Sequence, residues 1–402
     1  MVATVDVAII GAGPSGTAAA IMLARSGRTV VVIDKATFPR DKICGDGLTT
    51  GALRLLEDLG LKPASVASWK PVEDVIVHSP RHRTVTFPLP RGQGQFAVVA
   101  RRVDLDAALV ALAREAGATV LDGHAFTRID TLHDHVVVHA EGIEPITARH
   151  VIGADGMWSP LRKALGANVA GYLGEWHAFR QYFHSVAPRA ASELHVWFEP
   201  DLLPGYVWSF PLPDGRANVG FGITRGATIR TRDMKRLWPE ILARPHIRAV
   251  LGPGAVAESP HRAWPIPARV DAVQLASGRA LFVGDAAAAT DPMTGEGIGQ
   301  ALQSGVLAAQ AVIAGSPEDP AGVRSRYTTA MGRHLVADHR MSLRLARVLT
   351  HARSAEMAVR IAGSTSWTRR NFARWLFEDY PRAVLVTPRR WRRGMFAKPG
   401  AY

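Results

Sequence analysis

The segment GAGPSG, Gly11 to Gly16, decides the fold of this chain of 402 residues. It matches the pattern G-x-G-x-x-G, follows the apolar run 5–10 and opens a segment of helical composition that ends at Gly27. A second apolar run, TVVVID, ends at Asp34, 18 residues after Gly16. A strand, a glycine loop, a helix and a second strand in this order form the first unit of a doubly wound sheet that binds a dinucleotide.

Each residue of this loop has an expected task. Gly11 permits the tight turn, Gly13 lets a pyrophosphate approach the backbone N–H groups at the helix N-terminus, and Gly16 lets the helix pack on the strand. Asp34 is expected to accept hydrogen bonds from a ribose hydroxyl. The other cofactor contacts expected from this unit are Pro14, Ser15 and Lys35.

Two later segments extend the cofactor site. VIGADGMWSPLR holds Asp155 in a glycine turn, and LFVGDAAAATDPMTGEGIGQAL holds Asp285 and then a second glycine turn. An NAD enzyme needs only the first unit, whereas the ribityl chain and three-ring head of a flavin need more backbone. We therefore expect FAD, with Asp285 on the ribityl hydroxyls and the N–H groups of a helix start facing the reduced ring. The residues expected to contact it from the last segment are Gly284, Asp285, Gly295, Gly297 and Ile298.

The only cysteine of the chain, Cys44, lies in the glycine-rich stretch FPRDKICGDGL, residues 38–48. GAGPSG, GADG and GDA…DP…GEGI resemble, in this order, the FAD-dependent oxidoreductases of the para-hydroxybenzoate hydroxylase fold. Within that class, PRDKICGDG and GYVWSFP are similar to the P-x-x-K-x-C-G and Y/F-x-W-x-F-P signatures of the geranylgeranyl reductase family. The resemblance covers about residues 5–313.

The resemblance implies a place for the cysteine loop. In this fold the loop after the second strand passes near the flavin and the substrate cavity, so Arg40, Cys44 and Gly45 are expected at the cofactor. RRVDLDAAL resembles the family pattern R-x-x-F/L-D-x-x-L, which places Arg102 there as well. Cys44 would be a polarizable neighbour of the ring and a proton relay. The alternative is an inert buried cysteine.

Tyr206, Trp208 and Phe210 alternate along one expected strand and therefore share one face. We expect Pro211 and Trp197 to complete a slot for an apolar chain, the alternative being an ordinary sheet core. The resemblance implies enzymes that reduce isolated C=C bonds of prenyl chains, in lipids or polyprenyl quinones. Protonation of such an alkene puts positive charge on a tertiary carbon, and an aromatic face stabilises a cation by about 0.5–2 kcal/mol. The candidate catalytic residues are Cys44, Tyr206 and Trp208.

The order of patterns predicts the architecture. Beyond the first unit, helices alternate with strands, and from about residue 179 short runs separated by turn residues predict an antiparallel meander. We expect an α/β fold, with a Rossmann-like FAD-binding domain, an inserted antiparallel β-sheet substrate domain and a helical C-terminal segment. The expected units are 1–71, 97–172 and 270–325 for the FAD-binding domain, 72–96 and 173–269 for the substrate domain, and 326–402 for the basic C-terminal region.

Charge is unevenly distributed. Lys and Arg number 48 and Asp and Glu 35, a net charge of +13, and residues 331–402 alone hold 15 basic and 4 acidic side chains. A basic tail with Trp391 among four arginines suits an anionic membrane surface, the alternative being a solvated helix face. The four arginines are Arg389, Arg390, Arg392 and Arg393.

No run reaches the roughly 18 apolar residues of a membrane span, and a single cysteine fits a reducing compartment. We expect a cytoplasmic protein that is peripheral at the inner face of the membrane.

The motifs in the sequence also bear on the electron donor, on other partners and on the alternative functions. It has one dinucleotide fold, so NADPH or reduced ferredoxin would serve as a transient electron donor. No nucleic-acid-binding module appears, and the 15 histidines show no metal-ligand spacing. The second hypothesis is a flavin-dependent monooxygenase or halogenase acting on an aromatic substrate, although a halogenase would show W-x-W-x-I-P where this chain has YVWSFP. The third is a flavin-binding scaffold whose tail docks a partner.

Overall fold

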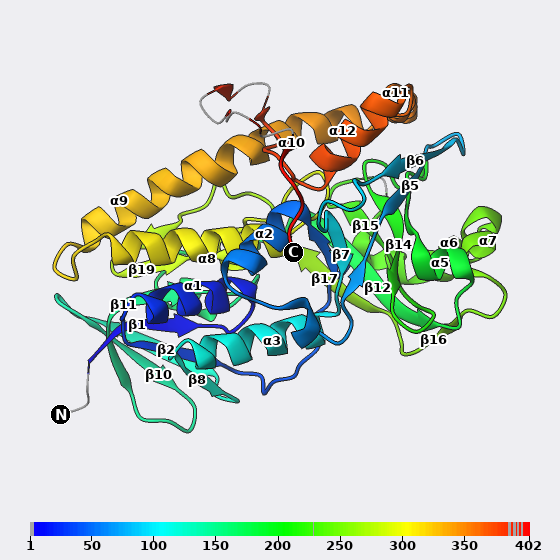
Figure 1. Ribbon diagram of the computed structural model, residues 1–402. Coiled ribbons are helices and arrows are strands. Elements are labelled where there is room, and N and C mark those ends of the chain that lie inside the picture. The colour runs from blue at the N-terminus through cyan, green and yellow to red at the C-terminus, as the bar shows by residue number, and fades with distance from the viewer. Residues whose placement is uncertain (1–3, 228, 385–386, 389–390, 392–393, 395–396) are drawn as a thin grey trace.

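Two eight-stranded β-sheets form the body of the protein, side by side in Figure 1. The computed structural model describes residues 4–227, 229–384, 387, 388, 391, 394 and 397–402. The first sheet has the order β18-β19-β11-β1-β2-β8, and a hairpin of β9 and β10 joins it at β11. Its strands are β1 (Val5–Ile10), β2 (Val30–Asp34), β8 (Thr119–Asp122), β9 (Phe126–Thr131), β10 (Val136–Ala140), β11 (Ile146–Gly153), β18 (Ala276–Ser277) and β19 (Ala280–Phe282). The parallel pairing of β1 with β2 and β11 is that of a doubly wound sheet.

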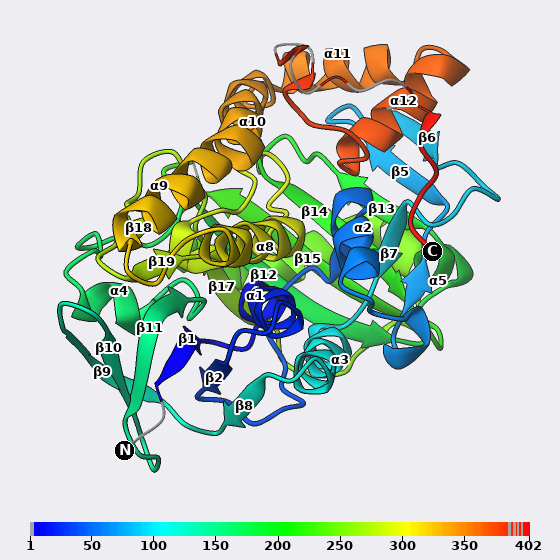
Figure 2. The ribbon, with the colours of Figure 1, turned by 60° about the vertical axis from the view of Figure 1, so that its left-hand side comes forward.

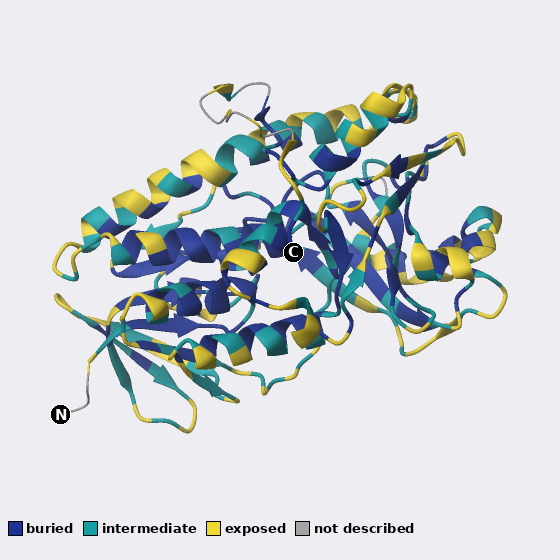
Figure 3. Ribbon diagram, viewed as in Figure 1, coloured by how far each residue is buried: buried dark blue, intermediate teal, exposed yellow. Residues whose placement is uncertain are grey.

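Three helices run beside the first sheet in Figure 1: α1 (Pro14–Arg25), α3 (Arg102–Glu115) and α8 (Ile298–Ile313). α8 begins directly after the glycine turn of the third motif. Small residues let it approach α1 closely, since a Cβ on Gly305 would lie 2.1 Å from the Ser15 carbonyl oxygen. Figure 3 shows α8 buried along most of its length.

The second sheet has the order β16-β12-β15-β14-β13-β5-β6, with β17 paired to β12. Its strands are β5 (Asp74–His78), β6 (Thr84–Pro88), β12 (Trp176–His184), β13 (Leu194–Trp197), β14 (Tyr206–Leu212), β15 (Arg216–Thr224), β16 (Val256–Ala257) and β17 (Arg262–Ile266). One face packs on α5 (Pro188–Ser192), α6 (Met234–Leu242) and α7 (Pro245–Leu251), where Val207 and Phe221 join a core with Trp238. The other face is therefore free to border the first unit.

A small third sheet, β3-β7-β4, lies between the two large ones in sequence. Its strands are β3 (Gly47–Thr49), β4 (Lys70–Pro71) and β7 (Ala97–Val99). β3 continues directly into α2 (Thr50–Asp58), whose start is capped by the Thr49 side chain accepting from Ala52 N–H. In the described part of the chain, the strands of the second large sheet come from 74–88 and 176–266.

The C-terminal region crosses the top of the molecule from the first unit to the second (Figures 1 and 2). Its helices are α9 (Pro320–Met331), a π-helical turn (Gly332–Val336), α10 (Ala337–Val348), α11 (Ala352–Ala362) and α12 (Ser366–Leu376). Among the described residues no α-helix follows Leu376. Instead the chain end returns to the body, with Ala401 bridged to Gln95. The four arginines around Trp391 lie outside the described residues.

Candidate active site

The first glycine loop joins β1 to α1 and has the shape that a pyrophosphate requires. Gly11 has φ of +105°, and a Cβ there would lie 2.3 Å from the Ala154 carbonyl oxygen. A Cβ on Gly16 would lie 1.9 Å from the Gly11 carbonyl oxygen, so the helix can approach the strand only with glycine. Gly13 is the N-cap of α1 and supplies no side-chain cap, with Pro14 following. The first N–H groups of α1 are thus left without an intrahelical acceptor, which makes an anion site.

Asp34 ends β2 beside this loop. Its carboxylate accepts hydrogen bonds from Ala12 N–H at 2.7 Å and Ala36 N–H at 2.8 Å. The half-buried side chain therefore lies beside the first glycine loop, its contact with a ribose stays a prediction, and Lys35 is exposed.

The second and third motifs meet the first in space. Gly284 has φ of +58°, and a Cβ on it would lie 2.8 Å from Ser15 Oγ at the start of α1. The Gly284 N–H donates to Ser304 Oγ on α8 at 2.9 Å. The GADG turn packs on Gly11 through Ala154, as described above. Three segments separated by more than 100 residues therefore converge on one helix start, as the sequence predicts for a dinucleotide.

Asp155 is used differently from the prediction. Its carboxylate accepts from Ser159 Oγ at 2.7 Å and from Leu161 N–H at 2.9 Å, at the start of α4 (Pro160–Ala164). Burial raises the pKa of this carboxyl to about 6 despite these hydrogen bonds. Both oxygens thus hold the turn that carries Ala154 against Gly11, and the side chain positions the loop.

The cysteine loop is tied to α3 by a buried ion-pair cluster. Arg102 donates twice to Asp106 at 2.8 Å, and Arg40 reaches the same carboxylate at 2.6 Å. Arg40 also borders the first glycine loop, since a Cβ on Gly13 would lie 3.7 Å from its Nη2. Asp106 is fully buried, so two guanidinium groups compensate its charge.

Cys44 and Lys42 both belong to the cysteine loop. Burial raises the pKa of the Cys44 thiol to about 11, so this cysteine is a neutral thiol at physiological pH. Burial lowers the pKa of Lys42 to about 8, against an opposing effect of Asp285. The Lys42 ammonium stands 3.5 Å from the ring centre of Trp264 on β17. The charge of Lys42 in the cysteine loop therefore interacts with that of Asp285 in the third motif.

Asp46 is a functional candidate that the sequence analysis missed. It is fully buried with φ of +65°, and its Oδ2 accepts from Tyr182 Oη at 2.7 Å and Asn218 Nδ2 at 2.8 Å. Burial raises the pKa of this carboxyl to about 6. The only sequence signal for it is an acidic residue between two glycines, in C-G-D-G. Its partners come from β12 and β15, which no local pattern connects to the loop.

The predicted aromatic stripe faces this loop. A Cβ on Gly45 would lie 3.5 Å from Phe210 and 3.8 Å from Trp208, so these rings pack directly on the loop backbone. Trp208 Nε1 donates to Asn218 Oδ1 at 3.0 Å, which fixes the ring orientation. Glycine at position 220 on β15 makes space for the Trp208 ring, because a Cβ there would lie 2.2 Å from that ring.

The strand pairing corrects two substrate-slot assignments. In the antiparallel pair of β13 and β14, Trp208 lies opposite Val196 and Trp197 lies opposite Val207. Residues directly opposite share a face, so Trp197 is on the far face, where it stacks on His78 and His195 in the core. Pro211 follows the same alternation and also lies away from the aromatic stripe. Both assignments to the slot are therefore wrong.

Two other aromatic side chains border Tyr206 instead. The ring centres of Trp176 and Phe198 lie 6.1 and 6.3 Å from that of Tyr206. Tyr206 Oη donates to the Thr294 carbonyl oxygen in the loop before α8. The stripe therefore runs from the cysteine loop at Phe210 to the third motif at Tyr206.

The start of α8 closes the site. Gly295 has φ of +72°, and a Cβ there would lie 3.7 Å from Tyr206 Oη. Gly297 is the N-cap of α8 without a side-chain cap, and Ile298 begins the helix. The positive end of this helix therefore lies beside the aromatic stripe and the cysteine loop, where a reduced ring that carries negative charge would be stabilised.

The residues present fit FAD. The uncapped α1 start and Asp34 suit the adenosine diphosphate portion, and Asp285 with the glycine turn at the start of α8 suits the ribityl chain and ring. These features define a flavin-binding oxidoreductase of the Rossmann-like class. The model of the FAD binding domain family matches residues 4–319.

Similar proteins show which family of flavin-binding oxidoreductases the chain belongs to. The chain is 36% identical over 331 residues, 76% of each chain, to a menaquinone reductase of Mycobacterium tuberculosis. It is 28% identical over 369 residues, 88% of each chain, to a digeranylgeranylglycerophospholipid reductase of Methanopyrus kandleri. The solved structure of a geranylgeranyl bacteriochlorophyll reductase-like protein from Thermoplasma acidophilum superposes with a TM-score of 0.78 at 22% identity, covering 96% of this chain and 99% of that one. The chain belongs to the geranylgeranyl reductase family of FAD-dependent oxidoreductases.

Metal-binding clusters and membrane-spanning helices are both absent from the part of the chain that the structure describes. No three or more His, Cys, Asp or Glu side chains gather there in a way that could hold a metal ion. No described helix has the length and hydropathy to cross a bilayer.

Proposed function

We propose that the protein reduces isolated C=C bonds in the prenyl chain of a lipid or polyprenyl quinone. The observation that carries this proposal is the packing of Trp208 and Phe210 against Gly45, in the loop that also reaches Arg102 and Asp285. An aromatic face therefore borders the cofactor residues directly. The names of the relatives, which include a menaquinone reductase and a digeranylgeranylglycerophospholipid reductase, support the same substrate class.

The side chains suit an alkene that must be protonated before it accepts hydride. Reduced FAD, when bound, supplies the hydride. Tyr206, Trp208 and Phe210 provide adjacent aromatic faces, with ring centres 6.0 and 6.2 Å apart, for a tertiary carbon that gains positive charge. The hydrogen bond from Trp208 to Asn218 holds the Trp208 ring in place. The ring therefore needs no reorientation during the reaction.

We propose NADPH or reduced ferredoxin as the electron donor, because the chain has a single dinucleotide fold that FAD would occupy. Flavin-dependent hydroxylation or halogenation of an aromatic substrate is the competing function. The residue pattern at 206–211 favours reduction over halogenation, since it lacks the W-x-W-x-I-P run.

Anaerobic turnover separates these functions. Holoprotein with photoreduced FAD is mixed with geranylgeranyl diphosphate or with a menaquinone, and flavin reoxidation and product mass are followed. We expect reoxidation with a product two mass units heavier per bond reduced. A product that gains sixteen mass units in air, with no anaerobic reoxidation, would establish hydroxylation instead.

We further propose that the protein works at the inner face of the membrane, docked by α11 and the start of α12. α11 packs one side on the body through Val359, whereas Met357 and Ile361 on its other side are 52% and 60% exposed. Trp367 on α12 is 67% exposed. The helices α10, α11 and α12 also carry exposed arginines, which suit an anionic lipid surface. The exposed basic residues are Arg344, Arg347, Arg353, Arg360 and Arg370.

The double variant Met357→Glu/Ile361→Glu should lose at least about tenfold in vesicle affinity, because each buried apolar side chain contributes about 1.5–3 kcal/mol. Co-sedimentation with vesicles of phosphatidylcholine and phosphatidylglycerol measures this. Leu132→Glu is the matched control, since Leu132 is 46% exposed between β9 and β10, at the other end of the molecule (Figure 1). Equal binding by the double variant and the control would contradict docking through α11.

A further inference from the structure

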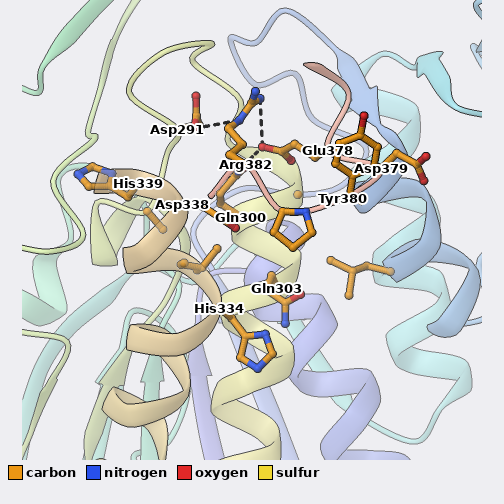
Figure 4. A pocket seen from close by; sticks show the side chains of 16 residues that line it. Asp291, Gln300, Gln303, His334, Asp338, His339, Glu378, Asp379, Tyr380 and Arg382 are labelled. Carbon is orange, nitrogen blue, oxygen red and sulfur yellow. Dashed lines mark hydrogen bonds and ion pairs between the residues drawn. The ribbon is translucent and has the colours of Figure 1, made fainter. Parts of the chain in front are cut away.

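A cavity of about 200 Å³ lies behind the third motif, between α2, α8, α10 and the segment after α12 (Figure 4). Exposed His334 stands at its rim, and Gln300, Glu378 and Arg382 form its inner wall. Arg382 is 3% exposed and pairs with Asp291 and Glu378, both at 3.3 Å. The cavity therefore ends on charged groups next to the loop that precedes α8.

Glu378 brings a carboxylate from the C-terminal segment into this wall. Its backbone has φ of +56°, and the preceding Phe377 carbonyl accepts from Thr50 N–H at 2.8 Å. Its carboxylate accepts from Gln300 Nε2 at 2.9 Å and from Thr49 Oγ1 at 3.2 Å. The side chain is 17% exposed, and it lines the cavity. Glu378 thus stands between the cavity and the junction of β3 with α2.

Glu296 approaches the same point from the cofactor side. Its Oε1 accepts from Gly299 N–H at 2.7 Å. A Cβ on Gly299 would lie 3.4 Å from Glu296 Oε1 and 3.6 Å from Glu378 Oε2, so both carboxylates border one glycine. Glu296 also affects the ionisation of Cys44 and Tyr206, which places it beside the aromatic stripe. The two glutamates therefore connect the cavity to the candidate active site.

The charges around the pair favour a bound proton. Among the described residues, four carboxyl groups, those of the pair included, interact there with the guanidinium group of Arg382. The charged and titratable neighbours are Asp291 in the same loop, Asp338 on α10, Arg382 in the C-terminal segment, Tyr206 on β14 and Cys44 in the cysteine loop. Like charges at close range cannot all ionise without cost, so one shared proton stabilises the cluster.

We propose that Glu296 and Glu378 share one proton and deliver it from the cavity to the reaction site beside Gly295. This rests on the proposed function. The proton forms a C–H bond at one alkene carbon, the hydride from the reduced cofactor forms a C–H bond at the other, and the π bond is lost. The pair is left with one more negative charge and regains a proton from water in the cavity.

The acidity of the pair agrees with this assignment. Burial, reinforced by Glu378, raises the pKa of Glu296 to about 8, and burial also raises the pKa of Glu378. An acid with this pKa is protonated at neutral pH and can still give up its proton. Because the donor form is lost as pH rises, reduction of the alkene should slow through pH 8.

The test compares Glu296→Gln and Glu378→Gln holoproteins with the exposed control Glu115→Gln at the end of α3. For substrate-driven reoxidation of reduced protein, Glu296→Gln should be roughly a hundredfold slower and lose the fall above pH 8. Glu378→Gln removes a neighbouring negative charge, so the fall should move to lower pH. The control should match the wild type. A merely structural role would lower the rate equally at every pH.

Infrared spectroscopy gives a readout that needs no substrate. The wild type should show the carbonyl band of a protonated carboxylic acid at pH 7, which disappears on titration through pH 8 and is absent from Glu296→Gln. Absence of the band from the wild type, or an unchanged pH profile in Glu296→Gln, would overturn the proposal. If the band behaves as expected but no prenyl substrate is reduced, the proposed function fails, and with it the alkene as the destination of the proton.

Discussion

Gly13→Val is expected to give a folded protein that binds FAD at least about a hundredfold more weakly than the wild type. The backbone at Gly13 has φ of −74° and ψ of −176°, which a β-branched residue adopts readily. A Cβ there meets nothing closer than Arg40 Nη2 at 3.7 Å, so the fold tolerates it. The added methyl groups would occupy the space over the α1 start. Two charge-assisted hydrogen bonds to phosphate, at about 1.5–3 kcal/mol each, would be lost.

Titration of the apoprotein with FAD, followed by flavin absorbance, measures this loss. Gly332→Ala is the matched control, because it adds a Cβ in a helical backbone with nothing within 4 Å. The control should bind FAD normally and be slightly more stable. Far-ultraviolet circular dichroism and Tm without FAD establish that Gly13→Val is folded. A Gly13→Val protein that retains FAD as tightly as the control would show that the dinucleotide lies elsewhere.

The cofactor half of the site could be predicted because its information is local. Gly11 has a positive φ, Gly16 is required by a contact with the Gly11 carbonyl oxygen in the same loop, and α8 follows its glycine turn directly. Such motifs carry their geometry in a few consecutive residues. The aromatic stripe of Tyr206, Trp208 and Phe210 was predictable for the same reason, since alternation along one strand fixes a shared face.

The other parts of the candidate site depend on contacts between strands and between distant segments, which no local pattern specifies. Trp197 was assigned to the wrong face because the register between β13 and β14 decides which residues stand opposite each other. A register shifted by one residue would place Trp197 on the other face of the sheet. Glu378 was missed for a different reason. It meets Thr49 from 329 residues away in sequence, and it belongs to a segment whose basic composition indicated only a surface.

Trp208→Ala is expected to lower the rate of prenyl reduction about 30-fold while leaving the FAD content unchanged. Removal of the aromatic face would cost about 2 kcal/mol of stabilisation of a cationic carbon, and each 1.36 kcal/mol corresponds to a factor of ten. FAD content should persist because the cofactor residues on α1 and α8 keep their own backbone geometry. The rate is measured as anaerobic reoxidation of the photoreduced holoprotein by substrate, below the lowered unfolding temperature that loss of a large buried ring brings.

Three further variants separate electronic stabilisation from packing. Trp208→Phe keeps an aromatic face but loses the hydrogen bond to Asn218, and it should recover most of the rate. Trp208→Leu fills part of the same volume without a π face, so it should stay as slow as Trp208→Ala. Trp197→Leu is the matched control on the neighbouring strand, where the ring packs on the opposite face of the sheet. It should lower the unfolding temperature but not the rate at low temperature. Equal rates for the Phe and Leu variants at position 208 would mean that the stripe only excludes water and packs the chain, because an aliphatic side chain cannot stabilise a cation through its face.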